Sequence, residues 1–155
     1  MLTKGLDNYQ GTAGNDTIIG SVSSNAELHT LSAVDVINGG AGVDTLKVSS
    51  DGTATAPAVA GTIALPTMTG VEIVEAQSAG ALTINASALA DVTNLNVVKA
   101  GGVVQATASA TADVKVAFAA TVNTAADTIT VEGGKNVAIA LTDVGDKNVI
   151  NAGTD

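Results

Sequence analysis

The sequence predicts an all-β fold, a right-handed parallel β-helix or β-roll solenoid in which short strands coil into stacked turns. Glycine-rich nonapeptides recur near the N-terminus, as is typical of solenoids. Short segments of alternating apolar and polar residues follow from Gly70 onward. The 155-residue chain has 17 glycines but one tyrosine, one phenylalanine and no tryptophan. Antiparallel sandwiches can also show regularly spaced strands, but the glycine-rich corners and the scarcity of aromatic residues favour the parallel solenoid.

The clearest repeat is Gly39–Lys47, which fits the pattern G-G-x-G-x-D-x-U-x, where U is a large apolar residue. Glycine tolerates backbone conformations with positive φ, so the carbonyl groups of such a turn can point toward one place. Asp44 adds a carboxylate there, and the residues after it continue as a short strand with Leu46 facing inward. Oxygen atoms gathered at a tight turn suit a hard cation, of which Ca²⁺ is the usual example. The segment therefore predicts half of a calcium site.

The same arrangement recurs 28 residues upstream, in Gly11–Ile19. Each nonapeptide follows the end of a preceding turn, so that Asp7 and Asp16 are spaced like Asp35 and Asp44. An alternative is that these aspartates only cap glycine-rich turns by accepting backbone hydrogen bonds. In the calcium interpretation, stacked carboxylates repel by about 4 kcal/mol at ~4 Å and an effective dielectric of 20. A bound ion replaces this repulsion by coordination, so metal affinity contributes to folding.

Composition excludes several classes of protein. The net charge is −9, from 15 acidic residues against 6 basic ones, all of them lysines. Without arginine or a basic stripe, nucleic acid is excluded as a partner. The absence of cysteine rules out disulfides and thiolate chemistry. No apolar stretch approaches the ~20 residues of a membrane-spanning segment, and Met1–Gly5 does not resemble a signal peptide, so we expect export to depend on a signal elsewhere.

The pattern divides the chain into three parts. Residues 1–52 form calcium-binding β-roll-like turns with a loop insertion at 20–34. Residues 53–69 carry both prolines of the chain and are predicted to be a linker or edge loop, because proline cannot donate to a strand ladder. Residues 70–155 are predicted to be solenoid strands, with one short helical segment at 86–91.

On these motifs the chain resembles calcium-binding surface-layer (S-layer) proteins of Gram-negative bacteria, which are exported by type I secretion and are related to the repeats-in-toxin family. The resemblance rests on Leu6–Thr17, Val36–Gly42 and Gly70–Val74, of which only the nonapeptides are specific. Thr12, in place of a glycine, departs from the pattern. The resemblance implies Ca²⁺ as cofactor and a location outside the cell, at the bacterial surface. The metal ligands that it implies are the carboxylates of Asp7, Asp16, Asp35 and Asp44 and backbone oxygens near Gly11, Ala13, Gly39 and Ala41.

We therefore expect a structural, self-assembling S-layer or surface-fibre protein whose folding and assembly depend on bound Ca²⁺. Its expected partners are other copies of itself, with lipopolysaccharide or surface glycans as the attachment. Neither end of the predicted solenoid shows an obvious polar cap, and open strand edges pair readily. The alternative is a spacer or binding module of a calcium-dependent secreted adhesin. An enzyme is not expected, because the chain has one histidine and because Glu72 and Glu75 look like outward strand positions.

Overall fold

The computed structural model describes residues 1–52, 61–118, 128–142 and 149–152, and these residues form strands and turns without a helix. The strands are β1 (Asn8–Gln10), β2 (Thr17–Val22), β3 (Val36–Asn38), β4 (Thr45–Ser50), β5 (Thr62–Ile63), β6 (Thr67–Thr69), β7 (Ile73–Ser78), β8 (Leu82–Asn85), β9 (Asn94–Lys99), β10 (Val104–Thr107), β11 (Asp113–Phe118), β12 (Thr128–Glu132), β13 (Asn136–Leu141) and β14 (Val149–Ala152).

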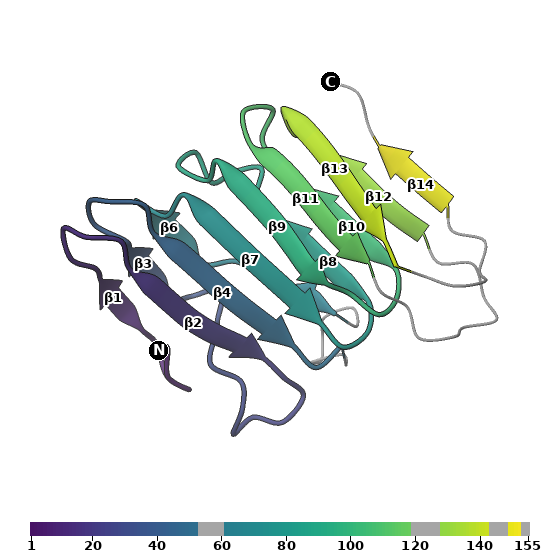
Figure 1. The fold of residues 1–155 in the computed structure, drawn as a ribbon. Helices are drawn as coiled ribbons and strands as arrows, with labels where there is room; N and C mark the ends of the chain where they lie inside the picture. The colour runs from purple at the N-terminus through teal and green to yellow at the C-terminus, as the bar shows by residue number, and fades with distance from the viewer. Residues whose placement is uncertain (53–60, 119–127, 143–148, 153–155) are drawn as a thin grey trace.

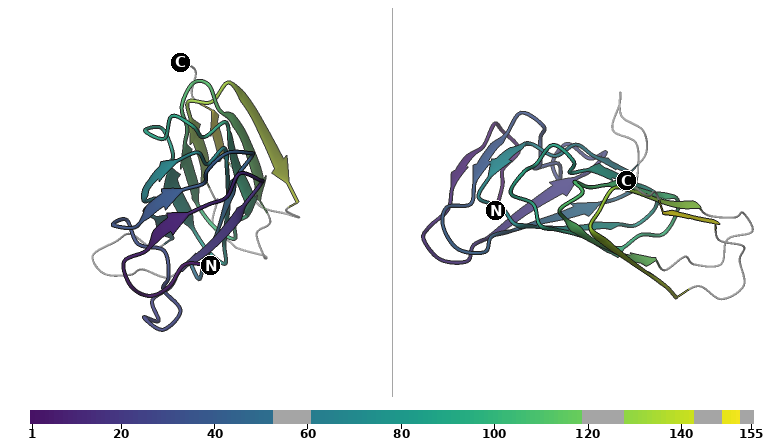
Figure 2. Two further views of the ribbon diagram at one scale, coloured as in Figure 1. Left: turned by 90° about the vertical axis from the view of Figure 1, so that its left-hand side faces the viewer. Right: turned by 90° about the horizontal axis from the view of Figure 1, so that it is seen from above.

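These strands form three parallel sheets (Figure 1). The six-stranded sheet has the order β13-β11-β9-β7-β4-β2, the five-stranded sheet β14-β12-β10-β8-β5, and the three-stranded sheet β1-β3-β6. Strands that follow each other in the chain lie in different sheets, so the chain returns to each sheet one turn further along. The views agree that β1 and β14 lie at opposite ends of the molecule (Figures 1 and 2). The predicted all-β fold with stacked parallel strands is confirmed.

The first turns are longer than the later ones. Equivalent positions are 28 residues apart from Asp16 to Asp44 and from Asp44 to Glu72, but 21 residues apart from Glu72 to Thr93. Among the described strands, only those of the first three turns contribute to the three-stranded sheet. Each longer turn therefore passes through the three-stranded sheet and turns a corner from there into the six-stranded sheet.

The core consists of ladders of aliphatic side chains. Ile18, Leu46, Val74 and Leu95 are neighbours in register on the six-stranded sheet, and all are fully buried. Every second residue of a strand faces inward, which is why the apolar residues of these strands alternate with polar ones. Burying a side chain of this size contributes about 1.5–3 kcal/mol. Phe118 supplies a fully buried aromatic ring.

The middle of the chain differs from the predicted linker at 53–69. Residues 53–60 lie outside the described residues, but β5 and β6 both fall within the predicted linker, and β6 pairs with β3. Pro66 directly precedes β6, where its missing donor costs no ladder hydrogen bond. Strand β4 pairs with β7 across this segment, so the six-stranded sheet is continuous from β2 to β13.

Three other segments differ in detail. Strand β2 runs to Val22, so the predicted loop insertion at 20–34 begins later. Residues 86–91 form turns instead of a helical segment, because so short a helix is not stable without packing. Strand β10 is absent from the prediction; its alternation consists of two inward side chains only, Val104 and Ala106, which is too short a signal.

The chain covers the outer edge of β2 at the N-terminal end. Leu2 N donates a hydrogen bond to Ile19 O at 2.8 Å, and Thr30 N donates to Ser21 O at the same distance. These carbonyl groups would otherwise be open to another strand. The expectation that neither end is capped is therefore wrong at this end.

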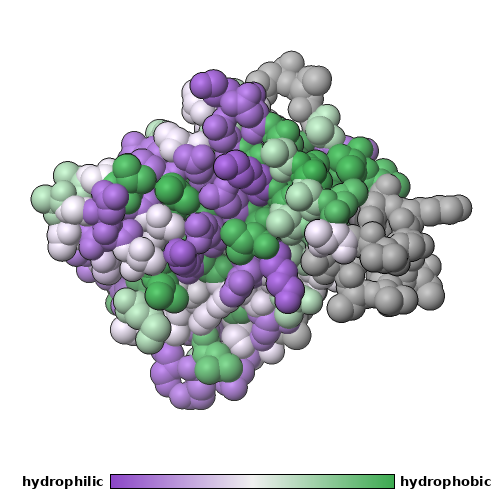
Figure 3. Space-filling view, in the orientation of Figure 1, coloured by the Kyte–Doolittle hydropathy of each residue, from purple (hydrophilic) through white to green (hydrophobic). Residues whose placement is uncertain are grey.

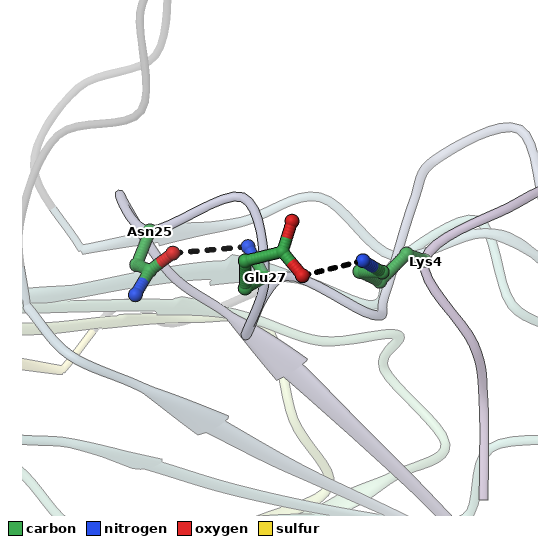
Figure 4. A network of polar contacts seen from close by, with 3 residues as sticks. All are labelled: Lys4, Asn25 and Glu27. Carbon is green, nitrogen blue, oxygen red and sulfur yellow. Dashed lines mark hydrogen bonds and ion pairs between the residues drawn. The ribbon is translucent and has the colours of Figure 1, made fainter.

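Side chains complete this N-terminal cap. Leu31 is buried against Gly20, where an added Cβ would lie 3.1 Å from the Leu31 Cβ. Lys4 and Glu27 form an ion pair of 2.6 Å that joins the N-terminal segment to the loop, and Glu27 N donates to Asn25 Oδ1 at 3.0 Å (Figure 4). Both charged groups are largely exposed, so this pair contributes at most about 1 kcal/mol.

Candidate metal centre

The candidate site lies where the chain passes from the three-stranded sheet into the six-stranded sheet. Residues 11–16, 39–44 and 70–72 form the corners at this point in the first three turns. The strand registers align Gly11 with Gly39 and Gly70 at the start of the corners. They align Asp16 with Asp44 and Glu72 at the end. The site is thus a stack of three corners, one turn apart.

The glycines allow the corners to approach closely. An added Cβ on Gly11 would overlap the carbonyl oxygen of Gly39, and one on Gly39 would overlap the carbonyl oxygen of Gly70. The point that a Cβ of Gly39 would occupy is also only 2.5 Å from Asp44 Oδ2. The Gly70 carbonyl group and the Asp44 carboxylate therefore converge beside Gly39, where any side chain would collide with them.

The acidic residues form two columns. In the first, Asp44 Oδ1 accepts a hydrogen bond from Asp16 N at 2.6 Å. Glu72 Oε2 in turn accepts one from Asp44 N at 2.7 Å. In the second column, at the start of the three-stranded sheet, Asp35 Oδ1 accepts a hydrogen bond from Asp7 N at 3.1 Å. Each carboxylate thus binds the backbone of the acidic residue one turn earlier.

Local hydrogen bonds satisfy some of the remaining oxygens, as the turn-capping alternative requires. Thr3 N donates to Asp7 Oδ2, and Thr12 N to Asp16 Oδ2, each at 2.7 Å. Ser32 N donates to Asp35 Oδ2 at 2.8 Å. Capping therefore accounts for part of the carboxylate contacts at three of the four predicted positions.

Asp44 is different. It is fully buried, and its Oδ2 has no hydrogen-bond partner. The nitrogen equivalent to Thr12 N is that of Gly40, which donates to Asn38 Oδ1 at 3.1 Å instead. A buried, unpaired carboxylate oxygen costs several kcal/mol unless something compensates its charge. This oxygen lies beside the carbonyl group of Gly70, so a cation at this corner would satisfy both.

No lysine compensates the columns within the part of the chain that the structure describes. The ion pairs there are Lys4–Glu27 and Lys47–Glu75, which lie elsewhere. The same residues contain no group of three or more His, Cys, Asp or Glu side chains gathered for a metal ion. A metal at the corners must therefore combine carboxylate oxygens with backbone carbonyls, and a mixed oxygen shell is what Ca²⁺ prefers.

The structure divides the predicted ligands between the two columns. Asp16 and Asp44 lie with Gly11 and Gly39 at the stacked corners, whereas Asp7 and Asp35 lie at the other end of the three-stranded sheet. The predicted ligands Ala13 and Ala41 occupy the exposed middle of their corners, and Ala41 N donates to Thr12 O at 3.1 Å.

Glu72 is the residue that the sequence reasoning missed. It precedes β7 and joins the first acidic column, instead of facing outward from a strand. The signal was present as the 28-residue spacing from Asp44, but the corner at 70–72 lacks the nonapeptide pattern. Glu75 does face outward and pairs with Lys47 at 2.9 Å.

Comparison with known families agrees with this geometry. Residues 3–25 and 28–48 match the RTX calcium-binding nonapeptide repeat. These repeats bind Ca²⁺, which is the cofactor. No curated protein and no solved structure was found to be similar to the chain. Proteins with RTX repeats are typically secreted, and none of the described residues belongs to a helix able to cross a membrane.

The stacked corners fit calcium, because each brings a carboxylate oxygen close to a carbonyl oxygen of the next corner: Asp16 Oδ2 and the Gly39 carbonyl oxygen beside Gly11, and the unpaired Asp44 Oδ2 and the Gly70 carbonyl oxygen beside Gly39. Within the matched repeats, Asp16 and Asp44 would hold an ion between the first and second corners, together with the Gly39 carbonyl oxygen. Asp7 and Asp35 would be the carboxylate ligands in the second column. The ion would supply positive charge between stacked carboxylates. The protein supplies and positions the oxygen ligands, because the glycines bring the corners together and the strand register stacks the acidic residues.

Tyr9, the only tyrosine, provides a test of the charge at these corners. Burial raises the pKa of its phenol above the ordinary value of 10.0, and the carboxylates of Asp16 and Asp44 raise it further. Because calcium offsets these negative charges, we expect the folded chain to have a lower Tyr9 pKa in calcium than in EGTA, measured by ultraviolet absorbance of the phenolate with circular dichroism to confirm that both samples are folded. The folded state holds this proton more tightly than the unfolded state, so stability is fully present below the ordinary pKa and declines as the pH rises through the raised one. Equal pKa values in both buffers would contradict the placement of calcium near these carboxylates.

Proposed function

We propose that this chain is a structural, self-assembling protein of the bacterial cell surface, an S-layer or surface-fibre component that folds and assembles with Ca²⁺. The observation that carries the proposal is the pair of carboxylate columns without a lysine partner among the described residues. Extracellular calcium modules typically bind with a Kd of ~10⁻⁴–10⁻³ M, so millimolar calcium outside the cell would order these turns. We infer that the function is structural and not catalytic.

The two ends of the fold differ, and only the end at β13 and β14 leaves strand edges open for association among the described strands. The edge of β2 is covered by Leu2 and Thr30, as described above. At the other end, β13 and β14 each pair on one side only within the described strands. Leu141, Val149 and Ile150 are between 41% and 48% exposed there. Strand edges that carry apolar side chains and no charge favour pairing with another chain.

Apolar surface also extends from this end onto the outer face of the six-stranded sheet. Outward-facing Val98, Ala138 and Ala140 are exposed. Figure 3 shows hydrophobic residues gathered over the side that carries β11 and β13, and more hydrophilic residues over the N-terminal turns. We infer that a second copy of this chain covers the β13 and β14 end.

A lysine at this end tests the proposed contact. We expect the native chain to associate in calcium, and Ile150→Lys to weaken association by about a hundredfold, because an unpaired ammonium group in an apolar contact costs roughly 3 kcal/mol or more. Size-exclusion chromatography and electron microscopy, with calcium or EGTA, would measure this. Ile19→Lys is the matched control, since Ile19 is equally exposed at 47% but lies near the capped end. A calcium-loaded native chain that stays monomeric at high concentration would sink the proposal.

The alternative is a spacer or binding module of a calcium-dependent secreted adhesin. It is favoured by the position of β1 and β14 at opposite ends, since such a rod can separate neighbouring domains. In this case the calcium-loaded chain remains monomeric, and its only role is to hold neighbouring domains of the adhesin apart. Lipopolysaccharide or surface glycans are the proposed attachment in either case. Phe118 is fully buried and so does not offer a stacking surface to a sugar.

A further inference from the structure

We propose that Glu72 is a further calcium ligand and that an ion lies between the second and third corners, held by Asp44, Glu72 and the carbonyl oxygen of Gly70. This site lies beyond residues 3–25 and 28–48, which match the RTX repeat. The proposal rests on calcium binding by the matched turns, and it is independent of self-assembly.

Glu72 occupies the position of a repeat aspartate. The strand register places it opposite Asp44, as Asp44 lies opposite Asp16. Its carboxylate accepts a hydrogen bond from Asp44 N at 2.7 Å, just as the Asp44 carboxylate accepts one from Asp16 N at 2.6 Å. The Glu72 carboxylate thus binds the backbone of the second corner in the same way as the Asp44 carboxylate binds the backbone of the first.

The length of the side chain matches the length of the corner. The second corner spans residues 39–44, whereas the third spans only 70–72, with a glycine at the start and an acid at the end of each. The shorter loop brings fewer backbone oxygens to the site. Glutamate is one methylene longer than aspartate, which allows its carboxylate to reach back toward the preceding turn.

Asp44 provides the independent sign of a ligand. Its Oδ2 is buried without a partner, and it lies beside the same point as the Gly70 carbonyl oxygen. An unpaired carboxylate oxygen and a carbonyl oxygen that face one space repel each other. A divalent cation can bind both oxygens at once, and Glu72 adds a second negative charge beside it.

The column ends after this rung. The residue that follows Glu72 in register is Thr93, whose N donates to Glu72 O at 2.9 Å. The nearby carboxylate of Asp91 accepts a hydrogen bond from Gly70 N at 2.8 Å, so it caps the end of the three-stranded sheet. We therefore infer one additional ion and no further extension.

The test is the number of calcium ions bound per folded chain, by equilibrium dialysis and native mass spectrometry. We expect Glu72→Gln to bind one ion fewer than the native chain. The matched control is Glu75→Gln, which removes an acid at the outward position of β7 that pairs with Lys47, and it should keep the native count. An E72Q protein with the native count and native affinities would overturn the proposal.

A second variant separates ligation from folding. Glu72→Asp keeps the charge and withdraws the carboxylate by one methylene, so it should retain the ion but bind it about tenfold to a hundredfold more weakly, as when a metal site loses good positioning. Native affinity in E72D would count against Glu72 as a ligand, even if E72Q failed to fold. Because the readout is ion count and affinity, failure here leaves calcium-dependent association of the native chain to be judged separately.

Discussion

Gly39→Ala is expected to be among the most destabilising single changes in the N-terminal turns. A Cβ at Gly39 would overlap the backbone carbonyl of Gly70 and lie 2.5 Å from Asp44 Oδ2. Overpacking typically costs about 1–3 kcal/mol, and we expect the upper end because backbone of the next turn must move. The same movement would separate the oxygens beside Asp44. G39A should therefore lower both the melting temperature in calcium, measured by circular dichroism, and the calcium affinity.

Gly14→Ala is the matched control for this prediction. Gly14 belongs to the equivalent nonapeptide one turn earlier, but the nearest atom to an added Cβ is Thr12 Oγ1 at 3.9 Å, and Gly14 has no positive φ. We expect G14A to melt within a few degrees of the native chain. If G39A were equally harmless, the stacked corners could not be as close as described.

The effect of Asp44→Asn on the melting temperature is expected to change sign with calcium. Without calcium, the asparagine amide can donate a hydrogen bond to the neighbouring Gly70 carbonyl group, and the substitution removes one negative charge from the column. It thereby removes the cost of an unsatisfied buried group, which is roughly 1–3 kcal/mol. With calcium, the loss of a carboxylate ligand weakens binding. A ligand at 100 times its Kd stabilises the folded state by about 2.7 kcal/mol, and D44N would forfeit much of this. The variant should thus melt above the native chain in EGTA and below it in calcium.

The same substitution at Asp113 serves as the control. Asp113 lies on β11, away from both columns, and its Oδ1 accepts a hydrogen bond from Asn136 Nδ2 at 2.7 Å. Its effect should not depend on calcium. Destabilisation of D44N by the same amount in calcium and in EGTA would mean that Asp44 is a turn cap and not a ligand.

The corners with the full repeat could be predicted from sequence because their chemistry is local. Gly39–Lys47 contains both the glycines that bend the chain and the carboxylate that follows, within one nonapeptide. Glu72 escaped prediction because its role depends on register: it becomes part of the column only when β7 pairs with β4. Its corner has lost three residues relative to the second one, so no local pattern marks it.

Long-range packing explains the other differences. The cap over β2 joins Leu2 and Leu31 through Gly20, and no local periodicity connects these residues. The linker prediction relied on proline, but Pro66 stands immediately before β6, at a position where a strand can begin. In both cases the conformational preference of the residue was read correctly from the sequence. Its position in the fold depended on pairing between distant turns, which the local sequence does not specify.

We infer that calcium lies between the stacked corners and compensates the carboxylate columns. Anomalous X-ray diffraction from crystals grown in calcium tests it most directly. We expect anomalous density between the first and second corners, beside Asp16 and Asp44, and a second peak in contact with Asp44 Oδ2 and the carbonyl oxygen of Gly70 if the additional ion is present. Well-ordered corners with no anomalous density, and with Asp44 Oδ2 bound to a protein donor or turned to solvent, would contradict it.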